Sequence, residues 1–256
     1  MLENKVIVVT GGSKGLGFAT SKALLALGAK VAIMARNQEA IDKAVETLGE
    51  NSFGIAVDVA NQQAVQQAFA RVHQHFGRID GLVNNAGLAR PNSIETLPAE
   101  DLMLQVNTNF VGLVYCTQAV IPYLREQKEA DGGRIINISS ASVHHDNEMS
   151  HLSIYASTKA AVEVFSRELR YEVTADNIGV TVLVPGATES EFGVGFDFDK
   201  LSKALHAWQE RGPLFDGTMK ARSIGQAVAH CFTYPKGVSV DFIEVKPHMP
   251  IAKPVF

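Results

Sequence analysis

Short apolar runs alternate with longer helical patterns from the first residues almost to the last. This alternation predicts βαβ units and therefore a parallel sheet. Several runs, such as VIVV, RIINI and VTVLV, are apolar without strict alternation, which indicates strands covered by helices on both faces. The expected strands are Val6–Thr10, Val31–Ala35, Gly54–Asp58, Gly81–Asn84, Arg134–Ser139, Gly179–Val184 and Val240–Val245. The expected helices lie near Gly15–Leu27, Gln38–Leu48, Gln62–Phe76, Ala99–Lys128, Ile154–Asp176 and Ser223–Tyr234.

These elements predict an α/β chain that forms one doubly wound Rossmann domain over residues 1–256, with about seven parallel strands and helices on both faces. No linker or repeat divides the chain. Residues 187–215 form one irregular zone, which is a candidate substrate lid because ligands of open α/β sheets bind at the carboxyl edge. Aromatic residues gather in this zone and point to an apolar or aromatic substrate: Phe192, Phe196, Phe198, Trp208 and Phe215.

Composition narrows the choice of partner. The formal net charge is −4, whereas nucleic acid or an anionic membrane surface would favour a basic face. A small molecule is therefore the expected partner. No stretch approaches the ~18 apolar residues of a membrane span, and the first residues resemble a strand more than a signal peptide, so we expect a cytoplasmic protein. Cys116 and Cys231 lie in apolar stretches that predict buried thiols rather than a disulfide.

A glycine-rich turn, TGGSKGLG, lies between the first expected strand and the first expected helix. Glycine accepts positive φ in such a turn, and its missing Cβ lets the backbone approach a phosphate. The N–H groups at the start of the helix can then face a pyrophosphate. The turn predicts a dinucleotide site formed by Gly11, Ser13, Lys14, Gly15, Leu16 and Gly17.

The end of the second strand bears on the choice of cofactor. NAD-binding domains usually carry an acidic residue there, which bonds the ribose 2′-hydroxyl, but this strand ends in MARN. Arg36 can pair with a 2′-phosphate because guanidinium presents a rigid fork to phosphate oxygens, and Lys14 adds a second positive charge. NADP(H) is therefore favoured over NAD(H). Asn37 leaves an alternative open, since it could bond a 2′-hydroxyl and let the site accept both cofactors.

Seven pieces of sequence now stand in a recognisable order. They are TGGSKGLG, DV at Asp58–Val59, NNAG at Asn84–Gly87, Asn109 before VG, ISS at Ile138–Ser140, YASTK at Tyr155–Lys159 and PG at Pro185–Gly186. With them the sequence resembles the short-chain dehydrogenases/reductases along nearly its whole length. The resemblance implies a nicotinamide-dependent oxidoreductase and a homodimer or homotetramer.

The resemblance also implies roles for single residues. Asp58 and Val59 would contact the adenine, and Asn85, Ala86 and Gly87 would support the cofactor site. Pro185, Gly186, Thr188 and Ser190 would lie near the nicotinamide amide, although the family more often has threonine where Ser190 stands.

Tyr155 and Lys159 lie four residues apart in an expected helix and so share one face of it. An ammonium ~4 Å from a phenolate stabilises it by about 4 kcal/mol at an effective dielectric of ~20. We therefore expect Lys159 to lower the pKa of Tyr155 from about 10 by as much as roughly three pKa units, with a nicotinamide cation adding to the effect. Tyr155 then fits a general acid/base, which gives its proton to a carbonyl oxygen as hydride arrives at carbon. Both residues also belong to the expected cofactor site.

By resemblance, Ser140 would bond the same oxygen and stabilise its developing charge. The family usually has this serine thirteen residues before the tyrosine, whereas Ser140 is fifteen before Tyr155 and Ser142 keeps the usual count. Because ISS marks a strand end, we expect a two-residue insertion and favour Ser140, with Ser142 in reserve. Asn109 would complete the set by holding a water that connects Lys159 to solvent. Asn107 is the competing residue, but the spacing to Gly112 favours Asn109.

The segment HHDNEMSH, residues 144–151, contains histidines and acids, but a polar loop offers no fixed metal geometry, and we predict no metal. It is better interpreted as a loop beside the substrate mouth. The leading hypothesis is an NADP(H)-dependent enzyme that interconverts a ketone or aldehyde and an alcohol. The alternatives are a cofactor-binding regulator without catalysis and a reductase of acyl thioesters, which would need a basic patch for a carrier.

Overall fold

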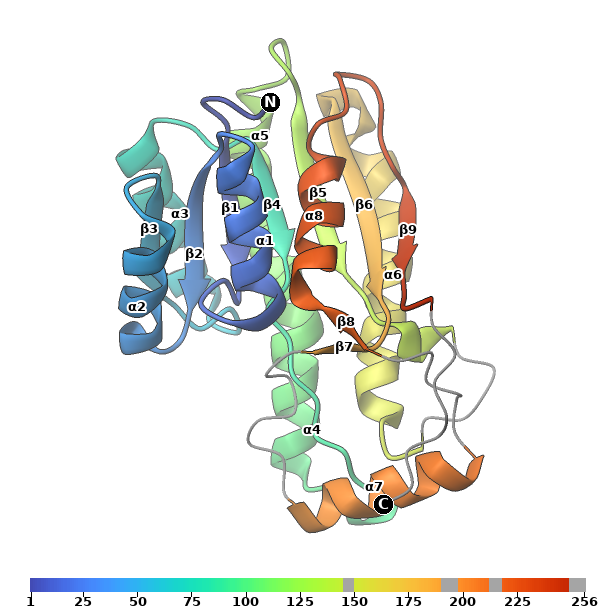
Figure 1. Cartoon of the computed structure of the whole chain (residues 1–256). Coiled ribbons are helices and arrows are strands. Elements are labelled where there is room, and N and C mark those ends of the chain that lie inside the picture. Colours follow the sequence, from blue (N-terminus) through green and yellow to red (C-terminus); the bar gives the residue numbers. More distant parts are fainter. Residues whose placement is uncertain (145–149, 190–197, 212–217, 249–256) are drawn as a thin grey trace.

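A seven-stranded parallel sheet forms the centre of the protein, in the strand order β3-β2-β1-β4-β5-β6-β9 (Figure 1). The computed structural model describes residues 1–144, 150–189, 198–211 and 218–248, with the backbone alone at 198 and 209–211. The sheet strands are β1 (Val6–Thr10), β2 (Lys30–Ala35), β3 (Ser52–Ala56), β4 (Gly81–Asn84), β5 (Gly133–Ile138), β6 (Ile178–Pro185) and β9 (Phe242–Val245). The predicted single-domain Rossmann fold is confirmed.

Helices cover both faces of this sheet. One face carries α1 (Gly15–Ala26), α2 (Gln38–Leu48) and α8 (Ala221–Cys231), and the other carries α3 (Gln62–Phe76), α5 (Gly112–Arg125) and α6 (Ser153–Val173) (Figure 1). The burial of β1 explains the layers. Val6 and Val8 belong to one core cluster, and Ile7 and Val9 belong to the other, as the two-residue period of a strand requires. An apolar run without alternation therefore supplies both cores at once.

Most expected elements differ from the structure by a few residues at their ends, and two of these differences have a cause that the structure shows. The third strand was expected at Gly54–Asp58 but spans Ser52–Ala56, because Asp58 Oδ1 accepts from Ala60 N (3.0 Å) in the turn that precedes α3. The long helix expected at Ala99–Lys128 is interrupted. It consists of α4 (Ala99–Val106), a π-helical turn at Asn107–Val111 and α5, and it ends at Arg125.

The zone expected to be irregular, residues 187–215, contains regular structure. Thr188–Glu189 (β7) pairs in parallel with Met219–Lys220 (β8), and Phe198–Arg211 forms the 14-residue helix α7. In Figure 1 α7 lies beyond the carboxyl ends of the sheet strands, at the same end of the molecule as α4. Prolines and glycines that border this helix in the sequence concealed its amphipathic pattern. Of the aromatic residues expected there, Phe192, Phe196 and Phe215 lie outside the described residues, as does the side chain of Phe198.

Thr10 is the last residue of β1, and its side chain bonds the end of β4 and the loop that follows it. Its Oγ1 accepts from the backbone N–H groups of Asn85 and Ala86 (both 3.0 Å) and donates to Val83 O (3.3 Å). Thr10 is buried. One hydroxyl therefore holds the loop after β4 against the glycine-rich turn.

We expect Thr10→Val to lower the free energy of unfolding by about 2 kcal/mol, because it keeps the shape but leaves the Ala86 N–H without its acceptor and the Asn85 N–H with Val83 O alone. Thr10→Ser is the matched control, since it keeps the hydroxyl and loses one methyl, worth about 1 kcal/mol. Urea unfolding of the two variants provides the measurement. A valine variant as stable as the serine variant would show that this hydroxyl does not hold the loop.

Candidate active site

The glycine-rich turn has the backbone that an anion site requires. Gly11 (φ +63°) and Gly15 (φ +55°) lie in the left-handed region, which favours glycine. Helix α1 begins at Gly15, and the side chain of its N-cap residue, Lys14, makes no capping hydrogen bond. The N–H groups of its first turn, at Gly15, Leu16 and Gly17, have no acceptor within the helix and lie at the positive end of the helix dipole, directly after Ser13 and Lys14 in the chain. These groups could hold a phosphate.

Asn85 anchors this turn from the neighbouring strand. Its Nδ2 donates to Thr10 O (2.9 Å) and Gly11 O (3.3 Å). A Cβ added at Gly17 would lie 2.3 Å from Gly11 O and 2.6 Å from Asn85 Nδ2, so the turn and helix pack too closely for any side chain there. The glycine at 17 is thus required by packing as well as by access to a ligand.

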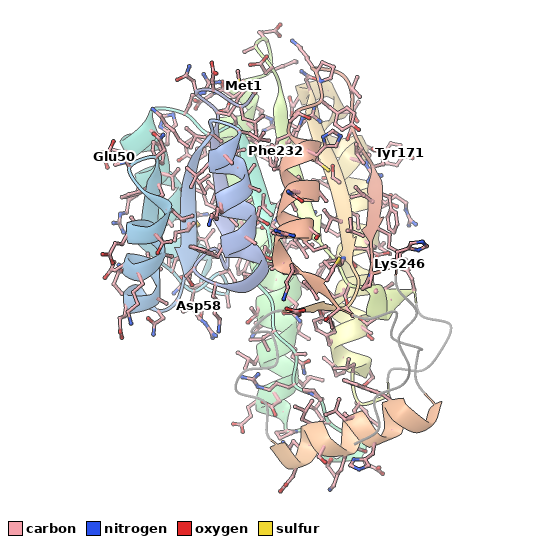
Figure 2. The ribbon with its side chains drawn as sticks, in the orientation of Figure 1. Met1, Glu50, Asp58, Tyr171, Phe232 and Lys246 are labelled. Atoms are coloured by element: carbon pink, nitrogen blue, oxygen red, sulfur yellow. The ribbon has the colours of Figure 1, made fainter. Side chains whose placement is uncertain are left out.

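The residues expected around the adenosine part of a cofactor lie at the same carboxyl edge. Arg36 follows β2 and is exposed, as is Lys14. Asp58 is exposed just beyond β3, where Figure 2 labels it. Val59 is buried against α5, because a Cβ at Gly112 would lie 2.7 Å from Val59 Cγ2.

Asn37, the alternative partner for a ribose hydroxyl, has a structural task. Its Oδ1 accepts from Ala40 N (2.8 Å) and caps α2. Its two amide N–H groups and one lone pair of Oδ1 remain for a ligand.

Lys159 is buried at the carboxyl end of β5. Its Nζ donates to Ile138 O (2.8 Å), and the residue is only 4% exposed. Burial lowers the pKa of Lys159 to about 8 because the ammonium loses its hydration. The ammonium lies 5.9 Å from the centroid of the Tyr155 ring.

Tyr155 is buried one helical turn earlier, with its hydroxyl hydrogen-bonded to Ser140. Burial raises the pKa of Tyr155 to about 12, and the bond to Ser140 acts in the opposite direction. The expectation of a pKa below the ordinary value for Tyr155 is therefore wrong for this structure. The reasoning used a partly hydrated pair, whereas loss of hydration dominates at both residues and the ammonium is directed at Ile138 O.

Ser140 and Ser142 form one hydroxyl chain that leads to Tyr155. Ser140 ends the extended segment after β5, and its Oγ accepts from Ser142 N (3.2 Å) and from Ser142 Oγ (3.0 Å). The serine in contact with Tyr155 is thus Ser140, and Ser142 lies behind it.

Asn109 is buried in the π-helical turn. Its Oδ1 accepts from Leu88 N (2.8 Å), and its Nδ2 donates to Leu88 O (2.8 Å) and to Thr158 Oγ1 (3.1 Å). A Cβ added at Gly87, which is exposed, would lie 3.4 Å from both Asn109 Oδ1 and Lys159 Nζ. Asn109 therefore holds the loop after β4 beside Lys159. One-turn π-bulges of this kind occur often at functional sites.

An apolar cluster surrounds Tyr155 on the side of α7. It consists of Tyr155, Ala89, Leu152, Ala204 and Trp208, with Leu205 packed against it. Trp208 is 9% exposed, and its Nε1 donates to Ser150 O (2.6 Å). Helix α7 thus binds to the segment that precedes α6, beside Tyr155.

The remaining expected residues follow β6. Pro185 ends β6, Gly186 N donates to Val245 O (2.8 Å), and Thr188 Oγ1 donates to Gly186 O (2.8 Å). Ser190 lies outside the described residues. The turn after β6 therefore lies next to the end of β9, at the same edge as the other site residues.

A polar contact that the sequence analysis missed lies behind Ser140. Glu163 Oε1 accepts from Ser139 Oγ (2.6 Å) and contacts His144 Nε2 (2.9 Å). The sequence did contain an indication of the position of Glu163, because Glu163 follows Lys159 by four residues and so lies on the same face of the helix. Thr10 was missed as well, although it ends the first strand.

Three further observations concern the described residues only. The described residues contain no group of three or more metal-ligating side chains. No helix among them is long and apolar enough to cross a membrane. Cys116 and Cys231 are both buried and free, as the sequence predicted.

Comparison with known proteins identifies the family. The family model for short chain dehydrogenases matches residues 5–197. Oxidoreductase BOA17 of Botryotinia fuckeliana (strain B05.10) is 39% identical over 189 residues, which cover 73% of this chain and 67% of that protein.

Two solved structures share the fold over most of the chain. A closed form of serine dehydrogenase complexed with NADP+ is 30% identical, with a TM-score of 0.82 and 94% of both chains covered. The 3-ketoacyl-(acyl-carrier-protein) reductase of Brucella melitensis, complexed with NADH, is 25% identical, with a TM-score of 0.83 and coverage of 98% of this chain and 100% of the other. The family match spans most of the chain and includes the glycine-rich turn and Tyr155–Lys159, and the chain therefore belongs to the short-chain dehydrogenase family of oxidoreductases.

Proposed function

We propose that this protein is an NADP(H)-dependent oxidoreductase that interconverts a ketone or aldehyde and an alcohol, with Tyr155 as general acid/base. The observation that carries the proposal is the buried Tyr155 hydroxyl, which is bonded to Ser140 and lies one helical turn from the buried Lys159. When bound, the nicotinamide cofactor would supply or accept the hydride.

Tyr155 would donate its proton to the carbonyl oxygen in the direction of reduction. With its pKa near 12 the phenol keeps that proton at neutral pH, and Lys159, with its pKa near 8, is still mostly charged. The ammonium would stabilise the phenolate that proton transfer leaves behind. Asn109 would assist, because the remaining lone pair of its Oδ1 can accept from a water that links Lys159 to solvent.

Ser140 would donate a hydrogen bond to the reacting oxygen. A serine hydroxyl has two acceptor lone pairs and one proton. In Ser140 both lone pairs are used by Ser142, through its N–H and its Oγ. With Ser142 as the donor in both bonds, the proton of Ser140 is left for Tyr155 or for an oxygen bound beside it. Such a fixed donor stabilises developing negative charge without reorganisation.

The cofactor is proposed to bind along the carboxyl edge of the sheet. The first turn of α1 would hold its pyrophosphate, and Asp58 and Val59, with Asn85, Ala86 and Gly87, would line its adenosine side and centre. Arg36 and Lys14 are exposed at the end where a 2′-phosphate would lie. Pro185, Gly186, Thr188 and Ser190 would lie near the nicotinamide amide. NADP+ and NADH are each bound by one of the two similar proteins, so the preference for NADP(H) rests on Arg36 and Lys14.

The substrate is proposed to be apolar or aromatic, with residues 187–215 as its lid. Ala204 and Trp208 from α7 meet Tyr155, Ala89 and Leu152 in one apolar cluster. A substrate whose carbonyl reaches Tyr155 would therefore contact apolar side chains on its other side. The cytoplasmic location and the homodimer or homotetramer stay predictions.

Tyr155→Phe is expected to bind cofactor as the wild type does but to lose at least ~10²-fold in turnover, since it removes the proton donor and keeps the ring. The assay is a panel of ketones, aldehydes and alcohols, followed by the absorbance of the reduced nicotinamide with each cofactor. Cofactor binding is measured separately by fluorescence. Turnover near the wild-type rate would refute the role of Tyr155, and cofactor binding without turnover of any compound by the wild type would favour a regulator.

Ser140→Ala is expected to lower turnover by about 10²-fold, the usual cost of one oxyanion donor. Ser142→Ala keeps the backbone N–H that orients Ser140, so we expect a loss below about tenfold. Steady-state kcat of both variants on one substrate gives the comparison. A larger loss for Ser142→Ala would assign the oxyanion contact to Ser142.

Arg36→Asp is expected to reverse the cofactor preference. Charge-assisted bonds to a phosphate are worth about 1.5–3 kcal/mol, which corresponds to roughly ten- to a hundredfold in kcat/KM. A carboxylate would repel the 2′-phosphate and accept from the ribose hydroxyls of NAD. The measurement is kcat/KM for both cofactors with both proteins. Equal efficiencies in the wild type, or a variant that still prefers NADP, would show that Arg36 does not select the cofactor.

A further inference from the structure

One carboxylate oxygen fastens both ends of the segment that carries Ser140. Glu163 Oε1 is 2.6 Å from Ser139 Oγ, which donates to it from just before Ser140, and 2.9 Å from His144 Nε2, just after the 3-10 turn Ala141–Val143. The segment between these two contacts therefore has little freedom to shift along α6.

The position of Glu163 links this contact to the proposed proton donor. Tyr155, Lys159 and Glu163 are spaced by four residues and follow one face of α6. Lys159 makes two contacts with the end of β5, because its Nζ donates to Ile138 O and its carbonyl oxygen lies 3.4 Å from Ser139 Oγ. Glu163 lies one helical turn after Lys159 on the same face. Helix α6 thus contacts three consecutive residues at the end of β5, which are Ile138, Ser139 and, through Tyr155, Ser140.

The Ser139 contact is the firmer of the two that Glu163 makes. Ser139 is 2% exposed, the side chain of Glu163 is 17% exposed and that of His144 is 40% exposed. A hydrogen bond from a hydroxyl to a carboxylate is stronger than one between two neutral groups. A buried hydroxyl that loses its acceptor also lowers the stability of the fold. The His144 ring also packs edge-on against Phe242 of β9, at 5.6 Å between centroids. Both ends of the segment are therefore held by α6, and its far end also by β9.

We propose that Glu163 is a positioning residue, which rests on the function proposed above: it holds Ser140 at the distance from Tyr155 that the reaction requires. A displacement of about 1 Å of a catalytic group can reduce a rate by as much as ~10²-fold. Because Glu163 acts through Ser139 and His144, its loss should affect kcat and leave the adenosine part of the proposed cofactor site, at the ends of β2 and β3, unchanged.

The test compares Glu163→Ala with Glu163→Gln, which keeps an acceptor oxygen in place of the carboxylate. Ser139→Ala removes the donor on the β5 side alone, in case the change at 163 prevents folding. Glu168→Ala is the matched control on α6, since Glu168 is 60% exposed and pairs with Arg167 at the surface. The measurements are kcat, KM for the substrate, and the dissociation constant of the cofactor by fluorescence.

We expect Glu163→Ala to lower kcat about tenfold, Ser139→Ala to lower it several-fold, and Glu163→Gln to stay within about threefold of wild type. The cofactor dissociation constant should change by less than about twofold in all of them. Wild-type kcat in Glu163→Ala or, if that variant does not fold, in Ser139→Ala overturns the proposal. A glutamine variant as slow as the alanine variant also overturns it, because the acceptor would then not be what matters.

Tyr155→Phe in the same assay separates the two proposals. If it is inactive while the Glu163 and Ser139 variants behave as wild type, the positioning role fails and the proposed function stands. If Tyr155→Phe is active, the proposed function itself fails.

Discussion

The arrangement of the site depends on one contact, the hydrogen bond from the buried ammonium of Lys159 to Ile138 O. A buried cation is unfavourable unless its donors are satisfied, and the end of a strand offers a carbonyl that no longer has to serve the sheet. This contact sets helix α6 against the carboxyl end of β5 in one register. With that register set, residues one turn away in either direction meet neighbouring β5 residues, Tyr155 with Ser140 and Glu163 with Ser139.

The fold could be predicted because burial on both faces leaves a plain trace in the sequence. Runs such as VIVV supply both cores, and the glycine-rich turn follows the first strand as a phosphate site requires. The pairing of Tyr155 with Lys159 follows from a four-residue spacing alone. Helix α7 was not predicted because glycines and prolines border its amphipathic pattern in the sequence. Its apolar residues pack against Ala89 and Leu152, which come from distant parts of the chain.

Other features of the site could not be predicted because they depend on surroundings rather than on spacing. Which of Ser140 and Ser142 contacts Tyr155 depends on how the chain turns after β5. The structure has Ser140 in that contact, as the strand end indicated and the thirteen-residue count did not. Asn37 could serve a ligand in the sequence, but it caps α2 in the structure. The contacts of Thr10 and Glu163 join elements far apart in the chain. The four-residue spacing places Glu163 on the same helical face as Lys159, but it does not identify Ser139 as its partner, and no local pattern predicts the contacts of Thr10.

The pKa of Tyr155 is raised, not lowered as expected from the sequence, and this bears on the proposed proton transfer. Burial favours the neutral form of both partners, so it raises the pKa of Tyr155 to about 12 and lowers that of Lys159 to about 8. At neutral pH the phenol therefore holds its proton while the ammonium is still mostly charged, which is the combination that a proton donor needs. To act as a base, Tyr155 would need further positive charge beside it. On the proposed function, burial thus keeps on Tyr155 the proton that the reduction of a carbonyl consumes, and the positive charge of an oxidised nicotinamide would favour the phenolate that the oxidation of an alcohol requires.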